Sequence, residues 1–408
     1  MTPIDLSNVP LADNHCHGIY RTQAPQAFRG VYPERSEWAQ ADNRTPVAQG
    51  DNREIITAWR GHFTESSDPG MRSSHVTTTL FYHRLVHKMA AFFECEPTEE
   101  AILAARQQFD EQQLISRFLR AANFDVLFMD KGFPPPELVL PDATVSELAN
   151  CRVAPMLRVE LLMQRLITEN ATFSAVVEAL RVALNDVRGQ GYVALKSIVA
   201  YRTGLDIRTW RIDDVEEAFA VARREVQERG SLRLAHKPLL DTLLHVTFAE
   251  AARQELPVQF HSGYGDTDAD MLLANPLHLR AVLERREYRA MPVVLLHECY
   301  PYTQQGAYLA TVYENVYLDL SYGIPYLGYH EMLEFTRAAF SVAPYSKLLY
   351  SSDAVGVPEL HWVSALDGRR ILGQVLGECV ANGDLSKTEA ERAGVAVLHD
   401  NALRLYKS

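Results

Sequence analysis

The chain has 408 residues, of which 47% are hydrophobic, and a formal net charge of -12 at pH 7. This size fits one elaborated α/β barrel or two ordinary domains, and the acidic balance argues against a nucleic-acid surface, which normally needs clustered lysine and arginine. We therefore expect a small-molecule partner and no nucleic-acid partner.

The amino-terminal residues 1–17 lack the basic segment and apolar run of a secretory signal, and no later stretch is apolar for long enough to cross a bilayer. We expect a cytoplasmic protein without a membrane partner, and the sequence leaves a homo-oligomer open. The five cysteines are scattered and form no CxxC pair, which is typical of reduced thiols. A metal ion would then be held by histidine and carboxylate side chains.

Short apolar runs predict eight parallel strands, and the amphipathic stretches between most of them predict helices. A closed (β/α)8 TIM barrel is the architecture that we expect, with an open doubly wound sheet as the alternative, because no linker-like tract interrupts the second half of the chain. The predicted strands are residues 11–17, 124–130, 152–160, 192–199, 257–262, 292–298, 316–321 and 348–353.

A long segment separates the first predicted strand from the second, far beyond the usual strand-to-helix loop. Residues 75–93 and 99–122 within it show helical periodicity. The segment leaves from the carboxyl end of a barrel strand, where such barrels place their active sites. We therefore expect residues 18–122 to form a mostly helical insertion that caps the active site, within a single domain spanning residues 1–408.

The first predicted strand ends with His15 and His17. Because side chains alternate along a strand, both imidazoles lie on the same face and can reach one metal ion. Taken alone, two histidines at this spacing also occur by chance or on a solvated strand edge. The interpretation therefore depends on the other strands.

Three later predicted strands end with His261, His297 and Asp353. Each residue alone could be a satisfied core histidine or a helix-capping aspartate. The carboxyl ends of barrel strands meet at one mouth, however, and apolar residues would fill a core there at a lower desolvation cost. Together these strand ends indicate an active site.

Residues beyond the fourth and fifth predicted strands should also face the barrel mouth, namely Tyr201, Arg202 and Tyr264. Arg202 could bind a substrate carboxylate through its planar guanidinium, or pair with an acidic neighbour on the rim. His83 and His87 have the spacing of a chelating helical pair. In their apolar surroundings we expect them to be packing or cap-lining residues rather than ligands.

Longer segments of the chain resemble the amidohydrolase superfamily, in its amidohydrolase-related branch. Residues 195–205, 259–283, 293–321 and 351–362 are similar to the amino-terminal domain of fungal FluG-type proteins, where it is fused to a glutamine-synthetase-like domain, and to stand-alone bacterial relatives. The resemblance is close in the second half of the chain and weak in the helical insertion. Because the sequence ends at residue 408, we expect it to act without the ligase-like domain.

The resemblance implies a divalent metal ion, zinc first with manganese or iron as alternatives, and one ion rather than two. In binuclear members of the superfamily, a lysine at the end of the fourth strand is carboxylated and bridges two ions. Lys196 has the matching position here, and its other role would be a cation that orients substrate or pairs with a carboxylate. The implied ligands are His15, His17, His261 and Asp353, with His297 beside the metal or its water.

The expected reaction is hydrolysis of a C–N bond, an amide, and the FluG-type resemblance suggests a γ-glutamyl amide. A divalent ion lowers the pKa of a water toward neutrality and polarises a carbonyl. Asp353 would accept the proton of this water and pass it to the departing amine, while His297 stabilises the oxyanion. Two alternatives stay open, a metal-dependent decarboxylase or lyase of the same barrel family and a non-catalytic regulatory barrel.

Overall fold

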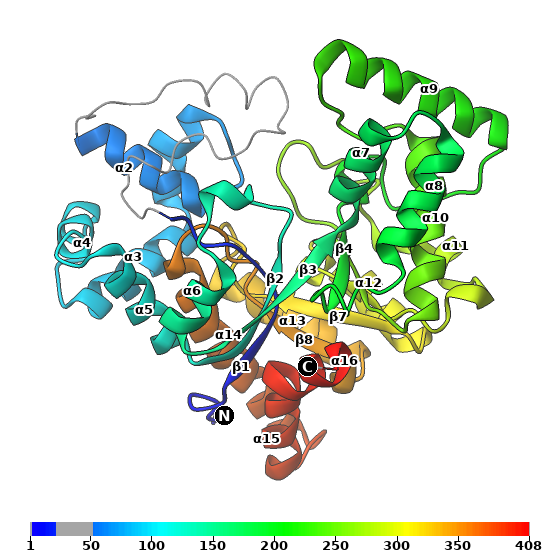
Figure 1. Ribbon diagram of the computed structural model, residues 1–408. Coiled ribbons are helices and arrows are strands. Elements are labelled where there is room, and N and C mark those ends of the chain that lie inside the picture. Colours follow the sequence, from blue (N-terminus) through cyan, green and yellow to red (C-terminus); the bar gives the residue numbers. More distant parts are fainter. Residues whose placement is uncertain (1, 22–51, 408) are drawn as a thin grey trace.

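The computed structural model describes residues 2–21 and 52–407. Its centre is an eight-stranded parallel sheet in which each strand pairs with the next one along the chain (Figure 1). The strands are β1 (Leu11–His17), β2 (Phe124–Asp130), β3 (Arg152–Arg158), β4 (Ala194–Ser197), β5 (Val258–Phe260), β6 (Val293–Leu295), β7 (Val316–Ser321) and β8 (Leu348–Ser351).

Backbone hydrogen bonds between β1 and the residues after β8 bring the two ends of the sheet together. The N–H of Asp353 donates to the carbonyl of His15 at 3.0 Å, and the N–H of His17 donates to the carbonyl of Ala354 at 2.9 Å. The expected (β/α)8 barrel is therefore confirmed, and the open sheet is excluded.

The predicted strands are correct in number and order, but several end earlier than predicted. The third strand ends at Arg158 rather than at residue 160, because α7 begins at Val159. The backbone leaves the sheet before His297 and Asp353, which adopt positive φ angles of 61° and 49°. These two side chains therefore project from turns that follow β6 and β8.

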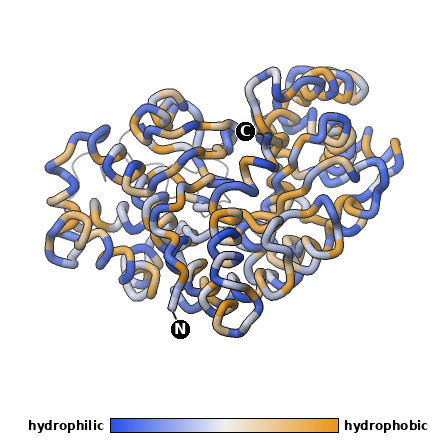
Figure 2. The backbone as a smooth tube through the Cα atoms, turned by 90° about the horizontal axis from the view of Figure 1, so that it is seen from below, coloured by the Kyte–Doolittle hydropathy of each residue, from blue (hydrophilic) through white to orange (hydrophobic). Residues whose placement is uncertain are grey.

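Helices surround the barrel, and in Figure 2 hydrophobic and hydrophilic stretches alternate along them, as expected for helices packed on one face. Those that follow β2 to β8 are α6 (Asp142–Ala149), α7 (Val159–Glu169), α8 (Phe173–Leu184), α9 (Ile212–Arg229), α10 (Lys237–Arg253), α11 (Arg280–Leu283), α12 (Thr303–Val312), α13 (Tyr329–Val342), α14 (Pro358–Asn382), α15 (Lys387–Val395) and α16 (Asn401–Tyr406).

The last helix, α16, closes the end of the barrel at which the strands begin. Tyr406 is buried among the residues of the barrel interior and packs its ring 4.4 Å from that of Phe128. Its hydroxyl donates to Oδ1 of Asn14 at 2.6 Å. Helix α16 thus closes the amino-terminal end of the barrel. An active site can therefore lie only at the other end, where the carboxyl ends of the strands meet.

The segment between β1 and β2 is largely helical where the structure describes it, and it lies on one side of the barrel in Figure 1. Residues 22–51 of the predicted insertion lie outside the described residues. Its main helices are α2 (Asn52–Arg60), α3 (Leu80–Phe93), α4 (Glu99–Arg106) and α5 (Glu111–Ala122). None of the helices in residues 2–21 and 52–407 combines the length and the apolar composition that crossing a bilayer requires.

Residues 99–122 form two helices rather than one continuous helix. Thr98 caps α4, and its side chain accepts the N–H of Ala101 at 3.2 Å. A second helix, α5, begins after Asp110, which forms a capping box with Gln113. The capping residue explains why the chain turns inside an otherwise periodic stretch.

Candidate metal centre and active site

His15, His17 and Asp353 meet where the first and last strands join. Oδ1 of Asp353 lies 3.5 Å from Nε2 of His15 and 3.5 Å from Nε2 of His17. Potential ligand atoms of the three residues lie within 4.8 Å of one another. This is the spacing at which three side chains can bind one ion.

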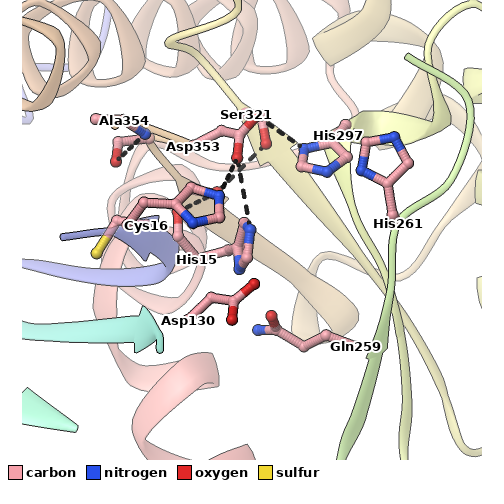
Figure 3. A network of polar contacts seen from close by, with 12 residues as sticks. His15, Cys16, Asp130, Gln259, His261, His297, Ser321, Asp353 and Ala354 are labelled. Carbon is pink, nitrogen blue, oxygen red and sulfur yellow. Dashed lines mark hydrogen bonds and ion pairs between the residues drawn. The ribbon is translucent and has the colours of Figure 1, made fainter. Parts of the chain in front are cut away.

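His297 and His261 complete the cluster from the opposite side of the barrel (Figure 3). Nδ1 of His297 lies 3.3 Å from Oδ2 of Asp353. The rings of His297 and His261 are 4.4 Å apart between centroids. All the histidines expected at the strand ends thus converge, while the sulfur of Cys16 points away from them in Figure 3.

Hydrogen bonds to backbone carbonyls fix which nitrogen of two histidines carries a proton. Nδ1 of His17 lies 3.0 Å from the carbonyl oxygen of Phe133, and Nε2 of His261 contacts the carbonyl oxygen of Tyr264. A carbonyl only accepts, so these nitrogens donate, and the other nitrogen of each ring keeps its lone pair. Such outer contacts are typical of histidines that bind metals.

Burial keeps His15, His261 and His297 neutral. Desolvation, with Lys196 and other cations nearby, holds the pKa of His15 and His261 well below its usual range, and burial and the neighbouring His261 do the same for His297. Among the described residues, Nδ1 of His15 and both ring nitrogens of His297 have no hydrogen-bond partner. Buried neutral imidazoles next to a carboxylate are a donor set that fits a divalent ion such as zinc.

Lys196 ends in the same cluster, from the fourth strand as predicted. Its side chain is buried, and Nζ lies 3.5 Å from Nε2 of His15. Burial lowers the pKa of this amine to about 8, against the opposing effect of Asp130. Within the described part of the chain no carboxylate forms an ion pair with it. Buried lysines with a lowered pKa are typical of functional sites.

His297 is presented by an unusual left-handed turn. Three consecutive residues, His297, Glu298 and Cys299, have φ angles of 61°, 39° and 56°. L residues other than glycine adopt this region at a cost of roughly 1 kcal/mol or more each, so surrounding contacts must hold the turn. Gly263 makes room for it, since a Cβ there would lie 2.4 Å from the carbonyl oxygens of Cys299 and Tyr300.

Two buried carboxyl groups anchor this turn to β7. The N–H of Glu298 donates to Asp319 at 3.2 Å, and the N–H of Ser321 donates to Glu298 at 2.9 Å. Burial raises the pKa of Asp319 to about 7 and that of Glu298 well above its usual range. Through these hydrogen bonds the two acids join the turn that carries His297 to the backbone of β7.

A second group of potential ligands, Asp13, Cys16 and His361, is wholly buried between β1 and α14. The carboxylate of Asp13 accepts the N–H and the hydroxyl of Ser352, at 2.8 and 2.5 Å. Ser352 precedes Asp353, so this contact fixes the strand end that presents Asp353. Because the carboxylate already has these donors, the arrangement fits a structural role.

The metal candidates line a cavity of about 460 Å³ at the carboxyl end of the barrel. Tyr201, Arg202 and Tyr264 line it, as the sequence predicts, and His83 and His87 do not. The latter two are exposed on α3, which corrects the expectation that they pack or line a cap.

The cavity also contains residues that sequence analysis did not single out. From the insertion come His62, Thr64 and Glu65, and the hydroxyl of Tyr264 donates to Glu65 at 2.8 Å. Arg158 enters from the end of β3. A position at the end of a strand could have identified Arg158 as a cavity residue. The predicted strand, however, ended two residues later than β3 does, so Arg158 was placed inside the strand.

Comparison with known proteins identifies the family to which this chain belongs. A family model described as Amidohydrolase matches residues 197–407, more than half of the chain. The chain belongs to the amidohydrolase family. The amidohydrolase match covers His261, His297 and Asp353, and the resemblance noted in the sequence is confirmed.

A curated relative extends the likeness to nearly the whole amidohydrolase chain. Protein fluG of Emericella nidulans is 28% identical over 432 aligned positions, which include 98% of this chain. The chain spans 46% of the length of that relative. The helical insertion is therefore included in the similarity.

Solved structures share the fold of this amidohydrolase. A Lactobacillus casei ATCC 334 protein assigned to the metal-dependent hydrolases is 26% identical and superposes with a TM-score of 0.80, over 99% of this chain and 98% of that one. A uronate isomerase from Bacillus halodurans C-125, 13% identical, has a TM-score of 0.62 over 98% of this chain and 94% of its own. The isomerase likeness concerns the fold alone.

Proposed function

We propose that the protein is a metal-dependent amidohydrolase that cleaves a C–N bond, an amide, of a small molecule. The observation that carries this proposal is the meeting of His15 and His17 with Asp353, all within 4.8 Å. Family membership supports a hydrolase, and the neutral, buried histidines support a metal site. The proposed ligands are His15, His17, His261 and Asp353, and the proposed metal is a divalent ion, zinc first.

The residues of the cluster have separate roles in this proposal. When bound, a divalent ion would lower the pKa of a water and polarise the amide carbonyl. Asp353 turns Oδ1 toward His15 and His17, and Oδ2 toward His297. It is therefore placed to accept a proton and to deliver it to the departing amine nitrogen. His297 donates a hydrogen bond to the carbonyl oxygen as negative charge develops there.

Lys196 determines how many ions the site holds. A free amine 3.5 Å from Nε2 of His15 is compatible with one ion, and a carboxylated amine would supply bridging oxygens for two. We propose one ion, since the described cluster of His15, His17 and Asp353 offers one set of converging ligands.

We also propose that residues 18–122 cap the site within a single domain of residues 1–408. Support comes from His62, Thr64 and Glu65, which line the cavity together with the strand-end residues. The contact between Glu65 and Tyr264 joins the insertion to the loop after β5. Substrate selectivity would then reside partly in the insertion.

The proposed substrate is a γ-glutamyl amide or a similarly acidic amide, a suggestion that comes from the likeness to FluG-type proteins. Purified protein loaded with zinc, manganese or iron is incubated with a panel of amides, and amine and carboxylate products are quantified. We expect one amine for each carboxylate, and loss of turnover on chelation. Release of carbon dioxide without an amine would instead establish a decarboxylase, and no turnover in metal-replete protein would favour a regulatory barrel.

A further inference from the structure

Arg158 is a charged residue of the cavity to which the proposed hydrolysis assigns no role. It ends β3 and lies beside Lys196 in the register of β3 with β4. It lines the same cavity as His15 and His297, and its side chain is only 10% exposed. Burying a guanidinium costs desolvation energy. The position of Arg158 beside the proposed reacting groups therefore suggests that this residue has a function.

Asp130, the last residue of β2, fixes the direction of the Arg158 side chain. Nε and Nη2 of Arg158 both donate to Oδ2 of Asp130, at 3.1 and 2.6 Å. Oδ1 of Asp130 accepts the N–H of Gly132 at 2.8 Å. Although burial raises the pKa of Asp130, Arg158 and other nearby cations hold it below its ordinary value. The carboxylate is therefore ionised and orients the guanidinium plane.

Gly132 leaves the space that Arg158 occupies. A Cβ at this position would lie 2.4 Å from Cδ and Nε of Arg158, and 2.5 Å from its Cβ. The ring of Phe133, whose carbonyl oxygen contacts His17, lies 6.0 Å from Cζ of Arg158. Arg158 is thus held in place by the same short segment that orients a proposed metal ligand.

The balance of charge around Arg158 favours an anionic ligand. Near the cations Arg158 and Lys196 lie the carboxylates of Asp130 and Asp353 and the carboxyl group of Asp319, whose pKa burial raises to about 7. A divalent ion bound at the proposed ligands would leave this buried region with excess positive charge. An anion that enters the cavity would relieve that excess.

We propose that Arg158 binds a carboxylate group of the substrate, so that the amide cleaved at this site belongs to an organic acid. The inference rests on the proposed function, because it places the carboxylate beside the metal centre. A guanidinium matches a carboxylate with two parallel hydrogen bonds, which selects acids over neutral amides. Asp130 and Gly132 are the positioning residues of this subsite, and a γ-glutamyl amide has the carboxylate that it requires.

Binding to zinc-loaded protein tests the subsite without requiring turnover. Isothermal titration compares glutarate with its neutral diamide, glutaramide. We expect wild-type protein to prefer glutarate, and Arg158→Met to weaken glutarate binding about 10- to 100-fold, the range for a lost hydrogen bond to a charged group. Gly132→Ala, which keeps the charge of Arg158 but displaces it, should weaken glutarate binding as well, while neither variant changes the affinity for glutaramide.

Arg152→Met is the matched control variant. Arg152 begins the same strand and pairs with Asp125 of β2 at 3.0 Å, so it joins the same two strands at their opposite end, where it is half exposed. Its loss should leave glutarate binding unchanged. The proposal would be overturned if both Arg158→Met and Gly132→Ala kept the wild-type affinity for glutarate. It would also be overturned if the wild-type protein bound glutaramide as tightly as glutarate, or bound inorganic phosphate more tightly than glutarate.

The two proposals fail in different ways. Arg158-dependent glutarate binding by a protein that hydrolyses no amide would contradict the hydrolase and support the carboxylate subsite. Efficient hydrolysis of neutral amides, together with glutarate binding that ignores Arg158, would overturn the subsite and leave the hydrolase standing.

Discussion

Asp353 and His15 are joined through their backbones, because the N–H of Asp353 donates to the carbonyl of His15 at 3.0 Å. Their side chains also meet, with Oδ1 of Asp353 3.5 Å from Nε2 of His15. The contact that closes the barrel therefore also assembles the proposed metal centre.

Loss of a proposed ligand should abolish metal retention. We expect His17→Ala to weaken zinc affinity by more than about 100-fold, because even outer contacts of metal ligands are worth 10–100-fold. Equilibrium dialysis against a zinc chelator measures this change. His83→Ala, which removes an exposed histidine of α3, is the control and should bind zinc as the wild type does. Equal zinc affinity in the two variants would contradict the assignment of His17.

Asp353→Asn should separate metal binding from catalysis. The amide keeps an oxygen near His15 and His17 but cannot accept a proton as the carboxylate does. We expect kcat to fall by about 100-fold or more, the usual range for a lost general base, in protein saturated with zinc. Steady-state kinetics on an amide that the wild type hydrolyses, with zinc content measured on the same sample, check this. Near wild-type turnover would exclude Asp353 as the base.

Glu298 should be required for the turn that presents His297. Glu298→Ala removes the acceptor of the Ser321 N–H, which is buried. We expect a loss of about 1–3 kcal/mol in the free energy of unfolding, the cost of an unsatisfied buried donor. Urea denaturation measures this loss, and Glu298→Gln, which keeps an acceptor oxygen, should recover most of it. If the glutamine variant were as unstable as the alanine variant, the charge of Glu298 would be needed instead.

The contact between Glu65 and Tyr264 should affect substrate binding rather than metal binding. Tyr264→Phe removes the hydroxyl that donates to Glu65 at 2.8 Å. We expect KM for a cleaved amide to rise several-fold while zinc content stays the same. Tyr308→Phe, on the exposed surface of α12, is the control. Unchanged KM in Tyr264→Phe would show that the insertion does not shape the cavity through this contact.

The sequence predicts the barrel and the meeting of the strand-end residues at its mouth, because strand-end position is a local property. The strands 11–17, 124–130 and 316–321 match the structure in full, and the residues expected at the mouth converge there. His297 is harder to place, since its left-handed turn is held by Asp319 and Ser321 of another strand. Such contacts between distant residues leave no periodic signal in the chain.

Arg158 and Glu65 show two different limits of prediction from the sequence. The apolar run that contains Arg158 continues into α7, so hydrophobicity alone places the strand end at residue 160 instead of residue 158. Glu65 reaches the site only through the packing of the insertion against the barrel. Nothing in the residues around it predicts that its carboxylate meets Tyr264.

The most direct test of the proposed metal centre is a crystal structure of zinc-loaded protein with anomalous data collected at the zinc edge. We predict one peak bonded to His15, His17, His261 and Asp353, with Lys196 unmodified beside it. A peak bonded instead to Asp13, Cys16 and His361, or no peak in protein that elemental analysis shows to contain zinc, would contradict the proposed metal centre.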